Sequence, residues 1–181
     1  MESDEVYVVA GHKGQPDRVR ASGRRGRRRR LKGARGRGTK AKDKPPVLGL
    51  IERGGQVVLR LLEDVKQTTI KPVIDAVVAP GSLIYSDEYT IYNRLKHWGY
   101  EHKSVNHSQG EYARDEDGDG HCEVHVNTME GCWSLLRSWL RPHRGISQDK
   151  LPLYLSFFEY VHNVRARGKY LLPELIRTLV C

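Results

Sequence analysis

Cysteine is scarce in this chain of 181 residues, and its spacing excludes two common uses. Cys122, Cys132 and Cys181 are odd in number and form no C-x-x-C pair, which argues against a disulfide framework and a zinc ribbon. No apolar run is long enough to cross a membrane, and the first residues have neither the basic start nor the apolar core of a secretory signal. We therefore expect a soluble, cytoplasmic protein with one hydrophobic core that includes Cys132.

Acidic residues are almost absent from residues 18–44, which contain fourteen Lys and Arg and one acid, Asp43. The local charge is +13, so the rest of the chain, with a total of +9, carries −4 (9 − 13). Because this segment is rich in Gly and Arg and has no aromatic residue, we expect a mobile basic arm that binds nucleic-acid phosphates. A solvated linker without a specific partner is the alternative. The predicted DNA contacts in the arm are Arg24, Arg25, Arg27, Arg28, Arg29 and Arg30.

Outside the arm, apolar runs and turn residues predict an α/β order of elements. Strands are expected at residues 4–9, 47–51 and 57–62, joined in an antiparallel meander whose last hairpin turns at Gly54-Gly55. The following pattern predicts helix 68–78, strand 83–85, helix 89–98, strand 101–105, an amphipathic helix after Asn127 and an apolar helix at 151–161. This order fits a ribonuclease-H-like, integrase-type mixed sheet with helices packed on it. We assign residues 1–17 to the first strand, 18–44 to the arm, 45–166 to the core and 167–181 to a tail.

Three carboxylates fall on elements that this fold would bring together. Its first and fourth strands are neighbours, so Asp4 and Asp87 are expected to meet at the sheet. The amphipathic helix carries Glu130 on the polar face that it shares with Arg137. Carboxylates are the ligands that hard cations prefer, and two such ions can stabilise the attacking and leaving oxygens of a phosphoryl displacement. We therefore expect two Mg²⁺ or Mn²⁺ ions at Asp4, Asp87 and Glu130.

The residue pattern leaves other interpretations of these acids open. Asn127 and Glu130 have the spacing of a capping box, in which Asn127 caps the helix and Glu130 reaches back to a backbone amide. The acidic run at residues 115–120 imitates the start of a calcium loop, but Val126 stands where a bidentate Glu is required, which favours a surface turn. His107 is the histidine expected closest to the carboxylates.

Several motifs occur in a specific order along nearly the whole chain. They are Asp4-Glu5-x-Tyr7, Ile84-Tyr85-Ser86-Asp87-Glu88-Tyr89, Val105-Asn106-His107-Ser108, His125-Val126-Asn127-Thr128-Met129-Glu130-Gly131-x-Trp133-Ser134, Arg141-Pro142-His143-Arg144-Gly145-Ile146 and Phe157-Phe158-Glu159-Tyr160. With these motifs the chain resembles bacterial insertion-sequence transposases of the DDE type, in the ISXO-like group related to Merlin elements.

The resemblance implies a transposase that cuts DNA at the inverted repeats of an element and joins the freed 3′ hydroxyls to target DNA. Asp4 and Asp87 match the first two catalytic acids and Glu130 the third, while Asn127 is a second candidate because some members are described with Asn there. DNA contacts are expected from Arg137, and from the motif residues Arg141 and Arg144. The expected protein is bacterial and nucleoid-associated, and forms a homo-oligomer on DNA.

The resemblance also implies that full-length members of this group have two parts, with a zinc ribbon and a helix-turn-helix region before the catalytic domain. Here Met1 stands three residues before the first matched acid, so we expect a truncated catalytic domain that does not transpose alone. The alternative function is a non-catalytic protein that binds nucleic acid through its Arg-rich arm.

Overall fold

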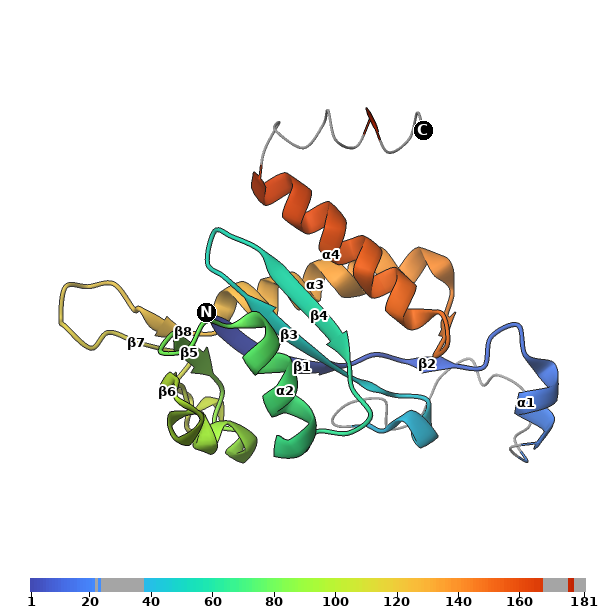
Figure 1. The fold of residues 1–181 in the computed structure, drawn as a ribbon, viewed down its shortest axis with the longest axis horizontal. Helices are drawn as coiled ribbons and strands as arrows, with labels where there is room; N and C mark the ends of the chain where they lie inside the picture. The colour runs from blue at the N-terminus through green and yellow to red at the C-terminus, as the bar shows by residue number, and fades with distance from the viewer. Residues whose placement is uncertain (22, 24–37, 168–175, 178–181) are drawn as a thin grey trace.

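The computed structural model describes residues 1–21, 23, 38–167 and 176–177. A five-stranded mixed sheet in the order β4-β3-β1-β5-β6 forms its centre (Figure 1). The sheet strands are β1 (Glu2–Tyr7), β3 (Pro46–Ile51), β4 (Val57–Leu61), β5 (Leu83–Ser86) and β6 (Glu101–Ser104). β1, β3 and β4 are antiparallel neighbours, as predicted, and β5 runs parallel to both β1 and β6. The predicted α/β order is therefore confirmed, with the first strand starting two residues earlier than expected.

Two hydrophobic layers cover the two faces of this sheet because the side chains of its strands alternate. On one face Val47, Ile51 and Val57 pack with α3 (Asn127–Leu140) and α4 (Leu151–Arg167). On the other face Leu48 and Leu50 pack with α2 (Gln67–Val77). Every residue of β3 is buried, which explains why its sequence is continuously apolar and does not alternate.

Short elements complete the described chain. They are β2 (Ala10–Gly11), α1 (Pro16–Ala21), β7 (Ala113–Arg114), β8 (Val124–His125), β9 (Ile146–Ser147) and the 3₁₀ helices η1 (Lys40–Lys42), η2 (Thr90–Arg94), η3 (Lys96–Trp98), η4 (His107–Gln109) and η5 (Arg141–His143). β2 pairs in parallel with β9, and β7 is antiparallel to β8. The predicted helix at residues 89–98 is wrong in type, because this stretch forms η2 and η3. Gly99 ends the stretch with a φ of 89°. The type was mispredicted because, over ten residues, an apolar pattern with the 3.0-residue repeat of a 3₁₀ helix cannot be distinguished from the 3.6-residue repeat of an α-helix.

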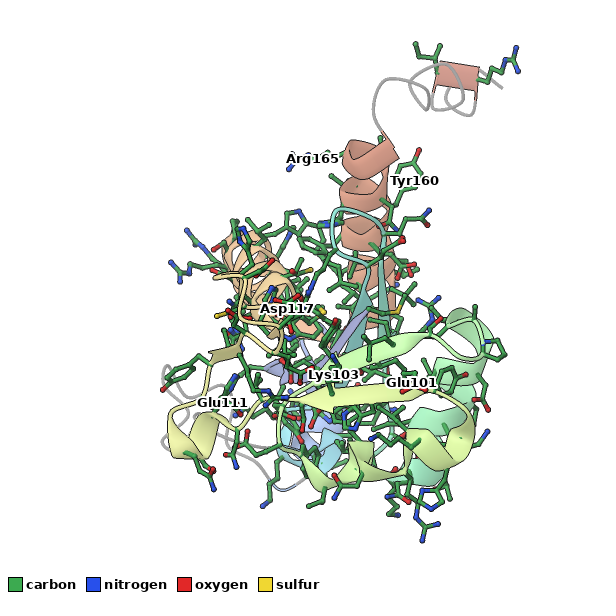
Figure 2. The ribbon with its side chains drawn as sticks, turned by 90° about the vertical axis from the view of Figure 1, so that its left-hand side faces the viewer. Glu101, Lys103, Glu111, Asp117, Tyr160 and Arg165 are labelled. Atoms are coloured by element: carbon green, nitrogen blue, oxygen red, sulfur yellow. The ribbon has the colours of Figure 1, made fainter. Side chains whose placement is uncertain are left out.

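α4 covers the edge of the sheet as well as its face. The Asn163 side chain accepts a hydrogen bond from Val57 N at 2.7 Å and donates one to Val57 O at 2.9 Å. Glu159 Oε2 accepts from Leu59 N at 2.9 Å. These side chains therefore replace part of the missing neighbour of edge strand β4. Figure 2 shows Tyr160 and Arg165 on the far part of α4, well away from Glu101 and Lys103 on β6.

The ends of the predicted basic arm include short ordered elements, namely α1 and η1. Its six predicted DNA contacts, Arg24, Arg25, Arg27, Arg28, Arg29 and Arg30, lie outside the described residues. Cys132 is buried in the core, as predicted, and burial raises the pKa of its thiol to about 11. Within the described part of the chain, no helix combines the length and apolar character needed to cross a membrane.

Candidate active site

Asp4 and Asp87 lie on adjacent parallel strands. Glu2 of β1 pairs with Tyr85 of β5. Because the two strands run in parallel, Asp4 and Asp87 each lie two residues further along. Asp87 directly follows the last residue of β5, and its Oδ1 accepts a hydrogen bond from Tyr89 N at 3.0 Å. The predicted adjacency of the first and fourth strands is thus present, and it places Asp4 and Asp87 at the same level along two neighbouring strands.

Glu130 reaches this region from the first turn of α3, which packs against β1 and β3. Its side chain is 53% exposed, and its Oε1 lies 3.9 Å from Nδ1 of His107, the histidine expected nearest to the acids. The negative charges of Asp87 and Glu130 both act on Asp4. Three carboxylates from β1, from the end of β5 and from α3 therefore share one electrostatic environment.

The pKa of Asp4 is raised from 3.8 to about 6. Burial is the largest cause, and the charges of Asp87 and Glu130 add to it. A hydrogen bond that Trp133 Nε1 donates to Asp4 Oδ2 at 2.8 Å opposes the increase. A divalent cation beside Asp4 would remove the cost of its ionisation, so the carboxylate donors fit a hard metal ion.

Trp133 can reach Asp4 because the facing strand has no side chain in its path. Asp4 pairs with Gly49 of β3, and a Cβ on Gly49 would lie 2.5 Å from Trp133 Cη2 and 2.6 Å from Met129 Cε. Neither Gly49 nor Trp133 was predicted from the sequence to support the acids. A glycine inside the apolar strand Val47-Leu48-Gly49-Leu50-Ile51 is the signal that was available, since such glycines mark close approach.

The capping-box interpretation of Asn127 and Glu130 is wrong. Val126 occupies the cap position of α3 without a side-chain cap, and the amide of Met129 donates to Glu2 Oε2 at 2.8 Å. A carboxylate from β1 thus takes the place of the local cap, and the described contact of Glu130 is with His107. Asn127 is exposed at the start of the helix, where its backbone amide donates a hydrogen bond to His125 Nδ1 at 3.3 Å.

Three predicted DNA contacts follow each other from α3 into the next turn. Arg137 lies on α3, Arg141 begins η5, and Arg144 ends η5 in a left-handed conformation with a φ of 51°. All three side chains are exposed. They form a basic edge at the end of α3 opposite to the end that carries Glu130.

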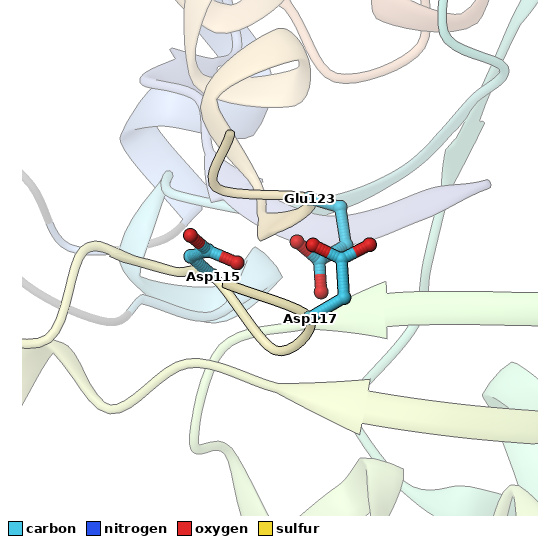
Figure 3. Close-up of side chains that lie close together, drawn as sticks. All are labelled: Asp115, Asp117 and Glu123. Carbon is cyan, nitrogen blue, oxygen red and sulfur yellow. The ribbon is translucent and has the colours of Figure 1, made fainter. Parts of the chain in front are cut away.

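A second acidic group lies in the loop between β7 and β8. Asp115, Asp117 and Glu123 have ligand atoms within 4.8 Å of one another, the only such trio among the residues that the structure describes (Figure 3). Asp115 accepts hydrogen bonds from Gly118 N and Gly120 N, and the latter is the largest cause that lowers its pKa. Because its acids already bind amides of the same loop, this group has the character of the predicted surface turn.

Comparison with known proteins adds a family to this geometry. Residues 1–163 match the ISXO2-like transposase domain. The chain belongs to this transposase family. A protein of transposable element ISH50 from Halobacterium salinarum is 36% identical over 185 residues, a match that covers 98% of the chain and 57% of that protein. A transposase-like protein of Haemophilus influenzae is 25% identical over 103 residues, which is 57% of the chain and 77% of that protein.

The chain therefore spans little more than half the length of its ISH50 relative. No solved structure matches it.

Proposed function

We propose that this transposase domain performs divalent-metal-dependent cleavage and strand transfer of DNA at insertion-sequence ends. Asp4, Asp87 and Glu130 are the proposed ligands of two Mg²⁺ or Mn²⁺ ions in a ribonuclease-H-like catalytic core. The observation that carries the proposal is the arrangement of three carboxylates on β1, directly after the adjacent strand β5 and in the first turn of α3, which packs on β1. The raised pKa of Asp4, to which the charges of Asp87 and Glu130 contribute, agrees with this arrangement. Family membership independently favours DNA as the partner.

The side chains have separate roles in this proposal. Bound divalent ions supply activation of a water or 3′ hydroxyl and neutralise charge on the leaving oxygen. Asp4, whose Oδ2 accepts a hydrogen bond from Trp133 Nε1, would hold a metal as an ionised carboxylate. The exposed guanidinium of Arg137 lies seven residues after Glu130 on α3, where it binds a DNA phosphate. Asn127 is the alternative third ligand, and as a neutral donor it would hold the metal more weakly.

The ligands of two ions need not all converge on one point, because the ions lie about 4 Å apart. This explains how the proposed trio can serve a metal pair although its oxygens do not meet the 4.8 Å spacing found in the β7–β8 loop. Because the chain covers 57% of its ISH50 relative, the proposal concerns the chemical step. Assembly of a homo-oligomer on DNA is part of the same proposal.

Asp87→Asn tests the metal site against the acidic loop. The substitution should reduce Mn²⁺ affinity, measured by calorimetry, and abolish Mg²⁺-dependent transfer of labelled inverted-repeat DNA, with DNA binding retained. Asp117→Asn is the matched control, because it removes one carboxylate from the other acidic group. Equal loss in both variants, or full activity of Asp87→Asn, contradicts the proposal.

The non-catalytic alternative rests on the charge of residues 18–44, where fourteen basic residues accompany one acid. If the arm binds DNA phosphates, replacing its six clustered arginines with Gln should flatten the dependence of log affinity on log salt. The slope should fall by about 0.9 for each phosphate that the arm no longer neutralises. An unaltered slope excludes the arm as the binding element. The non-catalytic alternative is favoured if the variant loses DNA binding and the wild type shows no metal-dependent cleavage or strand transfer.

A further inference from the structure

Glu2 is a charged residue with no exposed surface, and it lies on β1 two residues before Asp4. Successive residues of a strand alternate between faces, so Glu2 and Asp4 share the face that packs on α3. An unpaired buried carboxylate is strongly unfavourable, so its partners determine where the surrounding elements can lie.

The first set of partners belongs to the start of α3. Glu2 Oε2 accepts a hydrogen bond from Met129 N at 2.8 Å, and Oε1 accepts one from Thr128 Oγ1 at 2.9 Å. Glu2 thus satisfies the first turn of the helix, which a local cap usually does. Because this cap comes from β1, it fixes the distance between the strand of Asp4 and the turn of Glu130.

The second partner is Arg53, in the turn after β3. Its Nε donates to Glu2 Oε1 at 2.7 Å, while Nη1 and Nη2 donate to the carbonyl oxygens of Glu123 at 2.7 Å and His125 at 3.0 Å. The guanidinium lies 4.3 Å from the ring centre of Tyr85, two residues before Asp87. Arg53 therefore joins Glu2 to β5 and to the segment that leads into α3.

We propose that Glu2 and Arg53 are a positioning pair that sets the spacing of the three metal ligands. The inference rests on the proposed function. The pair contacts each element that carries a proposed ligand: β1 with Asp4, β5 before Asp87 and α3 with Glu130. Neither residue binds the metal. Loss of the pair leaves the acids in the chain but lets α3 move relative to the two strands.

The test measures Mn²⁺ affinity by calorimetry on the full chain at a temperature where circular dichroism shows each variant folded. Glu2→Gln keeps the shape of the side chain without its charge, and Arg53→Lys keeps the charge without the planar fork. Each should weaken Mn²⁺ binding about tenfold or more, which is the effect of losing a group that orients metal ligands. Hydrogen exchange at the Met129 amide should accelerate in both variants.

Two controls separate positioning from general destabilisation. Glu52→Gln removes an exposed carboxylate from the same turn, and Ile74→Val weakens packing in α2 on the opposite face of the sheet. Both should keep the wild-type affinity. Unchanged affinity in folded Glu2→Gln and Arg53→Lys, or an equal loss in Ile74→Val, overturns the inference and leaves the metal site standing. Failure of the wild type to bind Mn²⁺ overturns the metal site and, with it, this inference.

Discussion

Replacing Asp4 with Asn should stabilise the metal-free protein at neutral and alkaline pH. The folded state raises the pKa of Asp4 from 3.8 to about 6, so it binds this proton more tightly than the unfolded chain does. The cost of ionising Asp4 in the folded state is absent below pH 3.8, grows as the pH rises between the two pKa values and reaches its full size above about pH 6. A difference of about 2 corresponds to about 3 kcal/mol. Asn retains an oxygen for Trp133 and removes the charge that causes this cost.

Urea unfolding in the presence of EDTA measures this effect. At pH 8 the free energy of unfolding of Asp4→Asn should exceed that of the wild type by up to about 3 kcal/mol, and at pH 4 by only a small part of that amount. Asp149→Asn is the control, because hydrogen bonding from Gln15 and the charge of Arg18 lower the pKa of Asp149. That variant should gain nothing as the pH rises. A wild type as stable as Asp4→Asn at pH 8 would refute the reasoning.

Mg²⁺ should remove most of the stability difference between the two proteins. A ligand that binds only the folded state at about 100 times its dissociation constant adds about 2.7 kcal/mol. The wild type should gain stability on titration with Mg²⁺ at pH 8, whereas Asp4→Asn should gain much less because a proposed ligand is absent from it. Equal gains would place the bound metal elsewhere, and the β7–β8 loop would then be the site to examine.

Two further substitutions and one cysteine modification test the packing of the core and of the sheet edge. Gly49→Ala should cost about 1–3 kcal/mol in urea unfolding, because the added Cβ lies 2.5 Å from Trp133 Cη2; wild-type stability would show that the indole moves freely. Asn163→Leu should cost about 1–3 kcal/mol, because it leaves Val57 N and O on edge strand β4 unpaired; unchanged stability would mean that water replaces the side chain. Iodoacetamide should modify exposed Cys122 before buried Cys132 in mass spectra of the folded protein, and the reverse order would contradict the described core.

The order of the elements could be predicted because each carries a local signal. The strands of the meander are short apolar runs separated by Gly54-Gly55, and Gly54 has the positive φ of 70° that this turn needs. The amphipathic pattern after Asn127 gives α3 within one residue of its start. Residues 89–98 were harder, because buried Ile91, Tyr92 and Leu95 satisfy a 3₁₀ period as well as an α-helical one.

The residues around the acids could not be found in the same way. Trp133 and Asp4 are 129 positions apart, and Glu2 and Met129 are 127 apart, so no local pattern relates them. Their contacts follow from the pairing of β1 with β3 and from the packing of α3, which are properties of the whole fold. One local clue existed: Glu2 and Asp4 share a face of β1 with buried Val6, an unusual place for two carboxylates.

The two acidic groups show why closeness alone is a poor guide to a metal site. Asp115, Asp117 and Glu123 lie nearer to one another, yet each of them already accepts a hydrogen bond from a backbone amide of its own loop. Asp4 is in the opposite state, because burial and two neighbouring acids disfavour its charge. The free energy that a cation contributes is largest where ionisation is most unfavourable without it. That difference favours the strand acids as the place where a divalent metal acts.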